Sequence, residues 1–371
     1  MRASATMPIR YCVTHSPETG KRHMRKNLET NHDTSAIRRI LYAVKDPDPH
    51  CERGVAKAAA LAKACGASLE LFHAISTPLP LPTQPPSGES LEDLKRDSLE
   101  LQKLRLEKLA APARRRGVEV TSFAVWDYPP HDAIVRRAHQ IGADLVVAPC
   151  HQGARGKAWL VRLTDFELLR VSDVPVLLLK SLEPYRRPVV MAAVDPSHTH
   201  AKPLDLDLRI LADARHIAHS LRGEVHVLHV NRPPIHGLVY GEPIAGVQAA
   251  TSTYHELEKQ GRESLERLMM GAGVAKERCH LVDGSPVKAI PYFARALGAG
   301  LVVMGAVSRS GIRRIFIGNT AESILGELPC DVLVVKPKSF KKRVLTRRSG
   351  SAAGMARVVD QINVQPGGLW P

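Results

Sequence analysis

The chain has 371 residues, of which 44% are hydrophobic and 24% are charged, and its formal net charge is +15. This length leaves room for two domains with a sizeable core, and the apolar fraction excludes an intrinsically disordered chain. No apolar run reaches the roughly 18 residues that a membrane-spanning helix needs, and the N-terminal stretch contains no apolar signal-peptide core. We therefore expect a cytoplasmic, globular protein.

Cysteine spacing and charge distribution narrow the function further. The six cysteines stand singly, without a CxxC pair, so the sequence predicts neither a zinc site nor a disulfide framework. Much of the positive charge lies in two basic extensions, residues 1–36 and 339–371, the first of which we expect to be disordered. Aromatic residues make up only 4%, which argues against nucleic-acid binding as the main function.

In chain order, the first half alternates short apolar strands with amphipathic helices. The expected strands are residues 40–44, 68–75, 118–125, 143–149 and 175–180, and the expected helices are 54–66, 90–117, 132–142 and one before the last strand. Gly66 is placed to end the first helix, because glycine readily adopts the left-handed conformation of a C-terminal cap. In the long helix we expect five leucines to cover one face: Leu91, Leu94, Leu101, Leu104 and Leu109.

The second half of the chain repeats the first. Residues 38–49 resemble 187–198, residues 67–75 resemble 223–231, residues 127–149 resemble 283–305, and residues 174–180 resemble 330–336. The last three pairs share an offset of 156 residues, as between His73 and His229. Asp46 and Asp195 are 149 residues apart, which implies seven extra residues after the first strand of the second copy. The chain is therefore a tandem duplication.

Apolar strands between helices are typical of a parallel sheet that is buried on both faces. Five strands with right-handed crossovers predict a Rossmann-like, doubly wound α/β domain in each half. We place the first domain at residues 37–182, the linker at 183–188 and the second domain at 189–338. Because this linker is too short to let the domains separate freely, we expect them to pack as an internal pseudo-dimer.

The loop from Gly305 to Thr320 reads GAVSRSGIRRIFIGNT, between an apolar strand and a helix. The surrounding stretch, residues 302–336, resembles the end of a universal stress protein domain, and the duplication is similar to the tandem members of that family. Nucleotide-binding members carry a glycine, two residues, a glycine, nine residues, a glycine and a Ser or Thr. Gly305 and Gly318 match this pattern. The second glycine is replaced by Ser308, and Asn319 stands at the Ser/Thr position, with Thr320 next.

Elementary chemistry gives this loop two interpretations. Gly305 ends a strand at the carboxyl edge, and Gly318, Asn319 and Thr320 open a helix whose free N–H groups favour an anion. The alternative is that Gly318 and Asn319 merely cap the helix, since asparagine is a good N-cap. Ser308 also counts against an anion site if its backbone must adopt a positive φ.

The resemblance implies further contacts with a nucleotide in the second domain. Asp195 would face the adenosine part, Ala193 and Val194 would flank the base, Val230 would offer backbone groups, and Met304 would precede the first glycine. Asp195-Pro-Ser also reads as an ordinary turn before a helix. In the first domain, the positions of the motif hold Pro149, Gln152, Arg162 and Leu163. ATP is therefore expected in the second domain only.

No metal-ligand spacing and no nucleophile with a base is recognisable in the sequence, so we expect neither a metal site nor an enzyme. The resemblance implies a ligand-sensing or interaction module of stress resistance, including survival of DNA damage. It would assemble with itself or with other universal stress proteins and bind a small phosphate or apolar ligand. Two alternatives stay open: an ATP-binding protein with slow hydrolysis, and a scaffold that holds nucleic acid or anionic surfaces through its basic extensions.

Overall fold

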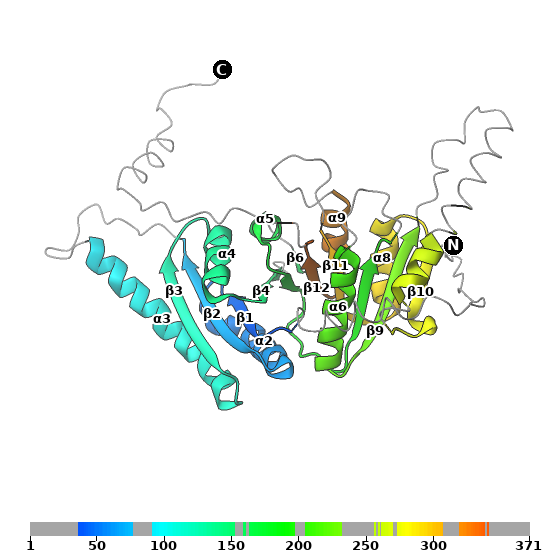
Figure 1. Cartoon of the computed structure of the whole chain (residues 1–371). Helices are drawn as coiled ribbons and strands as arrows, with labels where there is room; N and C mark the ends of the chain where they lie inside the picture. The colour runs from blue at the N-terminus through cyan, green and yellow to red at the C-terminus, as the bar shows by residue number, and fades with distance from the viewer. Residues whose placement is uncertain are drawn as a thin grey trace, which may run out of the picture.

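A computed structural model describes residues 36–76, 91–152, 159–160, 163–196, 205–231, 256, 259, 261–269, 273–306, 319–337 and 340. Figure 1 shows the arrangement of the elements along the chain. The expectations for most of the two basic extensions and for Ser308 and Gly318 fall outside the described residues.

The described residues of the first half form five strands of the main sheet and four helices. The strands are β1 (Arg39–Ala43), β2 (Ser68–Ile75), β3 (Val120–Trp126), β4 (Leu145–Pro149) and β7 (Val176–Leu179). The helices are α2 (Glu52–Cys65), α3 (Leu91–Arg115), α4 (Pro130–Ile141) and α5 (Leu163–Val171). Two short strands, β5 (His151–Gln152) and β6 (Trp159–Leu160), form a separate hairpin, and a 3₁₀ turn, η1 (Pro49–Cys51), precedes α2.

The second half follows the same order. Its strands are β8 (Val189–Val194), β9 (Glu224–Asn231), β10 (Cys279–Asp283), β11 (Ala299–Gly305) and β12 (Asp331–Val335). Its helices are α6 (Asp205–Ser220), α8 (Pro286–Ala296) and α9 (Asn319–Glu327), with a helical segment at 261–269 and a 3₁₀ turn, η3 (Lys276–Arg278).

The two halves form one ten-stranded sheet in the order β10-β9-β8-β11-β12-β7-β4-β1-β2-β3. Within each half all neighbouring strands are parallel, whereas β12 and β7 pair antiparallel where the halves meet. The last strands of the halves, β7 and β12, are thus hydrogen-bonded to each other in the middle of the sheet. This arrangement confirms two tandem doubly wound domains that join as a pseudo-dimer.

Helices cover both faces of the sheet, as expected for parallel strands that are apolar throughout. One core lies between the sheet and α2, α3, α6 and the segment at 261–269, and the other lies under α4, α5, α8 and α9. Central strands such as Val332–Val335 contribute side chains to both cores in alternation, because successive residues of a strand point to opposite faces. The sheet therefore places the carboxyl ends of its strands at well-defined positions.

The strand registers correct the equivalence that the sequence suggested for the first strands. Arg39 pairs with Ser68, and Val189 pairs with Glu224, so the first strands of the two domains are offset by 150 residues. Lys45, not Asp46, is therefore the counterpart of Asp195. The second copy has six extra residues rather than seven before its first helix, and the shared Asp-Pro dipeptide misled the alignment.

Helix α3 also differs in part from the expectation. Leu109 is buried, but the side chains of Leu101 and Leu104 are 47% and 55% exposed. The buried face instead continues through Leu106, Ala110 and Ala113. The reason is that small alanines let the helix lie close to the sheet, so the face that they share with Leu106 and Leu109 packs best. The prediction for α2 is confirmed, since Gly66 ends it with φ 66°.

Two lysines hold the halves together in a pseudo-symmetric way. Lys180, after β7, donates from Nζ to the carbonyl oxygens of Leu325 and Leu328 at the end of α9. Its counterpart Lys336, after β12, donates to the carbonyl oxygen of Arg170 at the end of α5. Each cation thus satisfies free carbonyls at the negative end of the other domain's last helix.

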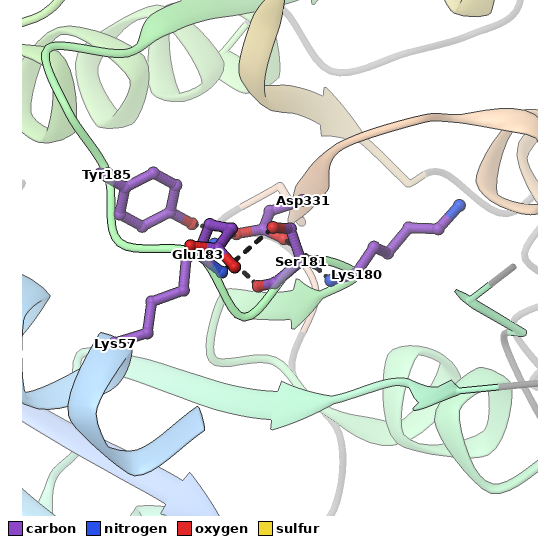
Figure 2. A network of polar contacts seen from close by, with 6 residues as sticks. All are labelled: Lys57, Lys180, Ser181, Glu183, Tyr185 and Asp331. Carbon is purple, nitrogen blue, oxygen red and sulfur yellow. Dashed lines mark hydrogen bonds and ion pairs between the residues drawn. The ribbon is translucent and has the colours of Figure 1, made fainter. Parts of the chain in front are cut away.

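A second junction contact has no symmetric copy. Figure 2 shows Asp331 among groups from both domains and the linker. Its carboxylate accepts the backbone N–H groups of Lys180 and Ser181 and the hydroxyl of Tyr185. It also forms a 2.5 Å ion pair with Lys57 of α2, and both of these side chains are almost fully buried. We call Lys57, Ser181, Tyr185 and Asp331 the junction network.

Candidate functional site

The predicted site residues that the structure describes gather at the carboxyl edge of three neighbouring strands of the second domain. Ala193 and Val194 end β8, Val230 lies near the end of β9, and Met304 and Gly305 end β11. Met304 pairs with Ala193, and Val194 pairs with His229, next to Val230. This edge includes the position between β8 and β11 where the strand order reverses, which is the usual ligand position of open α/β sheets.

Asp195 is held at this edge by its backbone. Its N–H donates to Oδ1 of Asp207 in the first turn of α6, at 3.1 Å, and Asp207 is 2% exposed. The preceding carbonyl, of Val194, accepts a hydrogen bond from Nδ1 of the buried His229. These contacts fix the chain on both sides of the Asp195 side chain. Met304 and Val194 are buried, whereas Ala193 and Val230 remain half-buried beside Asp195.

Gly305 lies close to a helix that packs against the end of its strand. A Cβ atom at this position would lie 2.8 Å from Cδ2 of Leu206 and 3.1 Å from Cδ1 of Ile210. The missing side chain therefore lets α6 pack closely against the end of β11. Helix packing thus accounts for a glycine at position 305, and its part in binding a phosphate stays a prediction.

Helix α9 begins at Asn319, as the sequence predicted for the end of the motif. The structure describes the backbone of Asn319 and Thr320, and their side chains lie outside the description. The first turn also contains Ala321 and Glu322, and the Glu322 carboxylate pairs with Arg170 of α5 at 2.7 Å. The acidic side chain of this turn therefore forms an ion pair with the first domain.

The corresponding edge of the first domain holds an ion pair that the sequence did not reveal. Nζ of Lys45, just after β1, lies 2.9 Å from Oδ1 of Asp165 in the first turn of α5. The Lys45 side chain is 29% exposed and that of Asp165 only 3%. Buried beside them, Cys150 has its pKa raised to about 12, mainly by burial and then by the Asp165 charge. Its thiol therefore stays neutral at physiological pH.

A histidine carries out the same task in both domains, as their equivalent positions predicted. His73 bonds the carbonyl oxygen of Val44 through Nδ1 at 2.9 Å, as His229 bonds that of Val194. Burial lowers the pKa of His73, so the neutral imidazole is favoured. These side chains fix the end of the first strand. His198 and His200 lie outside the described residues.

A further pair of histidines lies away from the carboxyl edge. Nδ1 of His226 on β9 is 3.1 Å from Nε2 of His280 on β10, and the His280 ring contacts Phe293 of α8. Burial lowers the pKa of both imidazoles. No group of three or more potential metal ligands occurs among the residues that the structure describes. The helices within the same ranges include none that is long and apolar enough to cross a bilayer.

Comparison with known proteins places these observations in a family. A model of the universal stress protein family matches residues 36–180 and again residues 189–336. Universal stress protein E of Escherichia coli K12 is 30% identical over 240 residues, which cover 62% of this chain and 72% of that protein.

Solved structures agree with the family match. A functionally unknown protein from Pseudomonas aeruginosa PAO1 superposes with a TM-score of 0.63 at 25% identity, and the match covers 82% of this chain and 95% of that one. A universal stress protein from Archaeoglobus fulgidus, at 17% identity, shares the fold with a TM-score of 0.56, over 80% of this chain and 98% of that one.

Proposed function

The chain belongs to the universal stress protein family, and from that premise we propose that it is a ligand-sensing and interaction protein of stress resistance. Its ligand would be ATP or a related phosphate compound, bound by the second domain at the carboxyl edge of β8, β9 and β11. The observation that carries the proposal is the gathering of Asp195, Val230 and Met304 at the point where the strand order reverses. Ligands of open α/β sheets bind at such points.

The chemistry of this edge separates into two parts. Half-buried Ala193 and Val230 offer apolar surface and backbone groups to a flat base, and the Asp195 carboxylate can accept hydrogen bonds from sugar hydroxyls. The first turn of α9 supplies free N–H groups at the positive end of a helix, which favour a phosphate. Asp195 and Asp207 make the same edge acidic, so a phosphate ligand is expected to bind together with Mg²⁺.

Binding rather than catalysis is the role that we propose. The alternative of slow ATP hydrolysis needs a base that activates water next to the γ-phosphate. At this edge, backbone contacts of Val194 and Asp195 hold the Asp195 carboxylate in place. This carboxylate is assigned to the adenosine part of the ligand, so it is not assigned the role of that base. Release of inorganic phosphate from ATP by the purified protein would favour the hydrolysis alternative.

The test begins with the protein as purified. Denaturing it and measuring released nucleotide, and recording a thermal shift in millimolar ATP–Mg²⁺, are expected to reveal a bound or binding nucleotide. Asp195→Ala should reduce the thermal shift strongly. Asp46→Ala is the matched control, because it removes an exposed aspartate just beyond the equivalent strand of the first domain. If the unaltered protein contains no bound nucleotide and also shows no thermal shift with ATP–Mg²⁺, the proposal is refuted.

The partners follow from the junction between the domains. The pairing of β7 with β12 joins the two domains inside one chain, so this contact is already satisfied. We propose assembly with a second copy or with other universal stress proteins through other surfaces, in a role that includes survival of DNA damage. Sedimentation of the purified chain with and without ATP–Mg²⁺ measures whether it assembles with itself.

A further inference from the structure

The Lys45–Asp165 ion pair of the first domain lies at the place that is equivalent to the proposed ligand site of the second domain. Lys45 follows β1, and the strand order reverses between β1 and β4, as it does between β8 and β11 in the second domain. Asp165 lies in the first turn of α5, the counterpart of α9. A buried carboxylate is thus held at the N-terminal turn of the first domain's last helix, paired with a lysine at 2.9 Å.

Backbone contacts make the two edges comparable residue by residue. The carbonyl oxygens of Val44 and Val194 accept hydrogen bonds from His73 and His229, which are equivalent in the duplication. The residues that follow these carbonyls, Lys45 and Asp195, are therefore equivalent as well. Ser172 and Leu328 make the same helix-ending bond, to Leu168 and Ile324 respectively. This bond aligns α5 with α9.

The alignment of the helices makes Ala321 the counterpart of Asp165. The first domain therefore combines a cation after its first strand with an anion in the helix, whereas the second combines an anion after its first strand with a methyl group in the helix.

This difference in charge between equivalent positions of the two domains has a consequence for the binding of an anion. A carboxylate near a helix N-terminus is stabilised by the same N–H groups and dipole that attract a phosphate. Once it is there, 3% exposed, it repels a second anion in surroundings where charges are weakly screened. Lys45, a cation at this edge that would attract a phosphate, is already paired with Asp165.

We propose that the Lys45–Asp165 ion pair takes the place of a phosphate in the first domain and so determines that only the second domain accepts an anionic ligand. The proposal rests on the proposed function for the choice of ligand. Ala321 is then the specificity-determining position of the second domain, because it places a methyl group where the first domain has the Asp165 carboxylate, and the carboxylate of the next residue, Glu322, is paired with Arg170.

Exchanging the two helix residues tests the proposal. Ala321→Asp should weaken ATP–Mg²⁺ binding by at least about tenfold in isothermal titration, since it copies the block into the second domain. Ala321→Asn is the matched control for size, and it should stay within about threefold of the unaltered protein. Equal affinity of Ala321→Asp and the unaltered protein would overturn the proposal, and so would equal losses in both variants.

The reverse exchange opens the first domain and does not need ATP. Asp165→Asn keeps the shape of the side chain, and Asp165→Ala removes it, in case one of them fails to fold. Both leave Lys45 without its carboxylate, so millimolar inorganic phosphate should raise their melting temperature by several degrees more than that of the unaltered protein. Equal phosphate effects in all three would contradict the block.

The two failures are distinguishable. If the unaltered protein does not bind ATP–Mg²⁺, the proposed function fails, and the phosphate comparison at Asp165 still decides the role of the ion pair. Lys45→Met combined with Asp165→Asn should lose the phosphate effect again, because the freed cation is what attracts the anion. Retention of the effect in this double variant would contradict the part assigned to Lys45.

Discussion

The two domains share one backbone plan but distribute their charges differently at equivalent places. Position 57 of α2 holds the lysine that pairs with Asp331 in the junction network, whereas the equivalent position of α6 holds Asp213. Near the outer ends of the sheet, Glu70 of β2 pairs with Arg137 of α4 in the first domain, whereas the equivalent of Glu70 in the second domain, His226 of β9, contacts His280 of β10. Duplication thus preserved the fold while each copy acquired its own polar contacts, and each pair of positions can be tested against its twin.

The largest effect is expected at the junction network. Lys57→Met removes the cation from a pair whose members are 3% and 0% exposed. Asp331 would be left buried with its remaining hydrogen bonds but without its ion-pair partner, which costs about 3–5 kcal/mol. Urea unfolding measures the loss, and Lys103→Met on the exposed side of α3 is the control for removing a lysine. A stability within 1 kcal/mol of the unaltered protein would show that the network is dispensable.

The twin position should respond in the opposite direction. Burial raises the pKa of Asp213 to about 6, and its Oδ2 has no hydrogen-bond partner among the described residues. Because the folded-state pKa lies above the unfolded value, this carboxyl destabilises the fold increasingly as the pH rises from about 4 to 6. Asp213→Asn should therefore stabilise the protein by about 1–2 kcal/mol at pH 7.5 and by little at pH 4.5. Equal effects at both values would disprove titration as the cause.

The histidine pair near the outer end of the second domain's half of the sheet predicts a pH response. Burial lowers the pKa of His226; the Glu224 charge opposes this shift and the Arg278 charge adds to it. The pKa of His280 is lowered by burial and by the neighbouring His226. With folded-state values below the unfolded one, the unfolded chain takes up protons first, so stability falls as the pH drops through about 6.5. In the first domain, Arg137 binds Glu70 with two hydrogen bonds and lies over Phe123.

Unfolding at pH 7.5 and 5.5 tests this response. Replacing both histidines by glutamine should reduce the loss of stability between these values by on the order of 1 kcal/mol. The comparison must be between variant and parent, because Asp213 changes stability in the opposite sense over part of this range. His50→Gln, at an exposed position of the first domain, is the control. An unchanged loss in the double variant would remove the histidine pair as its source.

These contrasts also show where sequence reasoning succeeds. The apolar strands, the repeat and the short linker predicted the two doubly wound domains and their pairing, because burial on both faces leaves a period that survives divergence. The family resemblance pointed to Asp195, Val230 and Met304, which the strand pairing brings to one edge of the sheet. The helix start at Asn319 followed from a capping residue.

What the sequence did not reveal depends on side chains that are distant in the chain. Lys45 and Asp165 are 120 residues apart, and a misaligned Asp-Pro dipeptide drew attention to Asp46 instead. Contacts in which a small residue makes room for a large side chain are equally difficult to recognise in the sequence. Gly54 makes room for the hydroxyl of Tyr42, where a Cβ would lie 2.2 Å away, whereas the second domain has Ile210 in place of Gly54. Such compensations require the packed structure, since neither partner is unusual alone.

The smallest expected effect concerns the face of α3 that the leucine spacing misassigned. Leu101→Ala and Leu104→Ala should each change the free energy of unfolding by less than about 0.5 kcal/mol, because both side chains remain largely in contact with water. Burial of the same leucines against the sheet would instead make each truncation cost about 2–5 kcal/mol. Urea unfolding of the two single variants separates these values clearly. A large loss in either would mean that α3 packs on the face that the spacing of the leucines predicts.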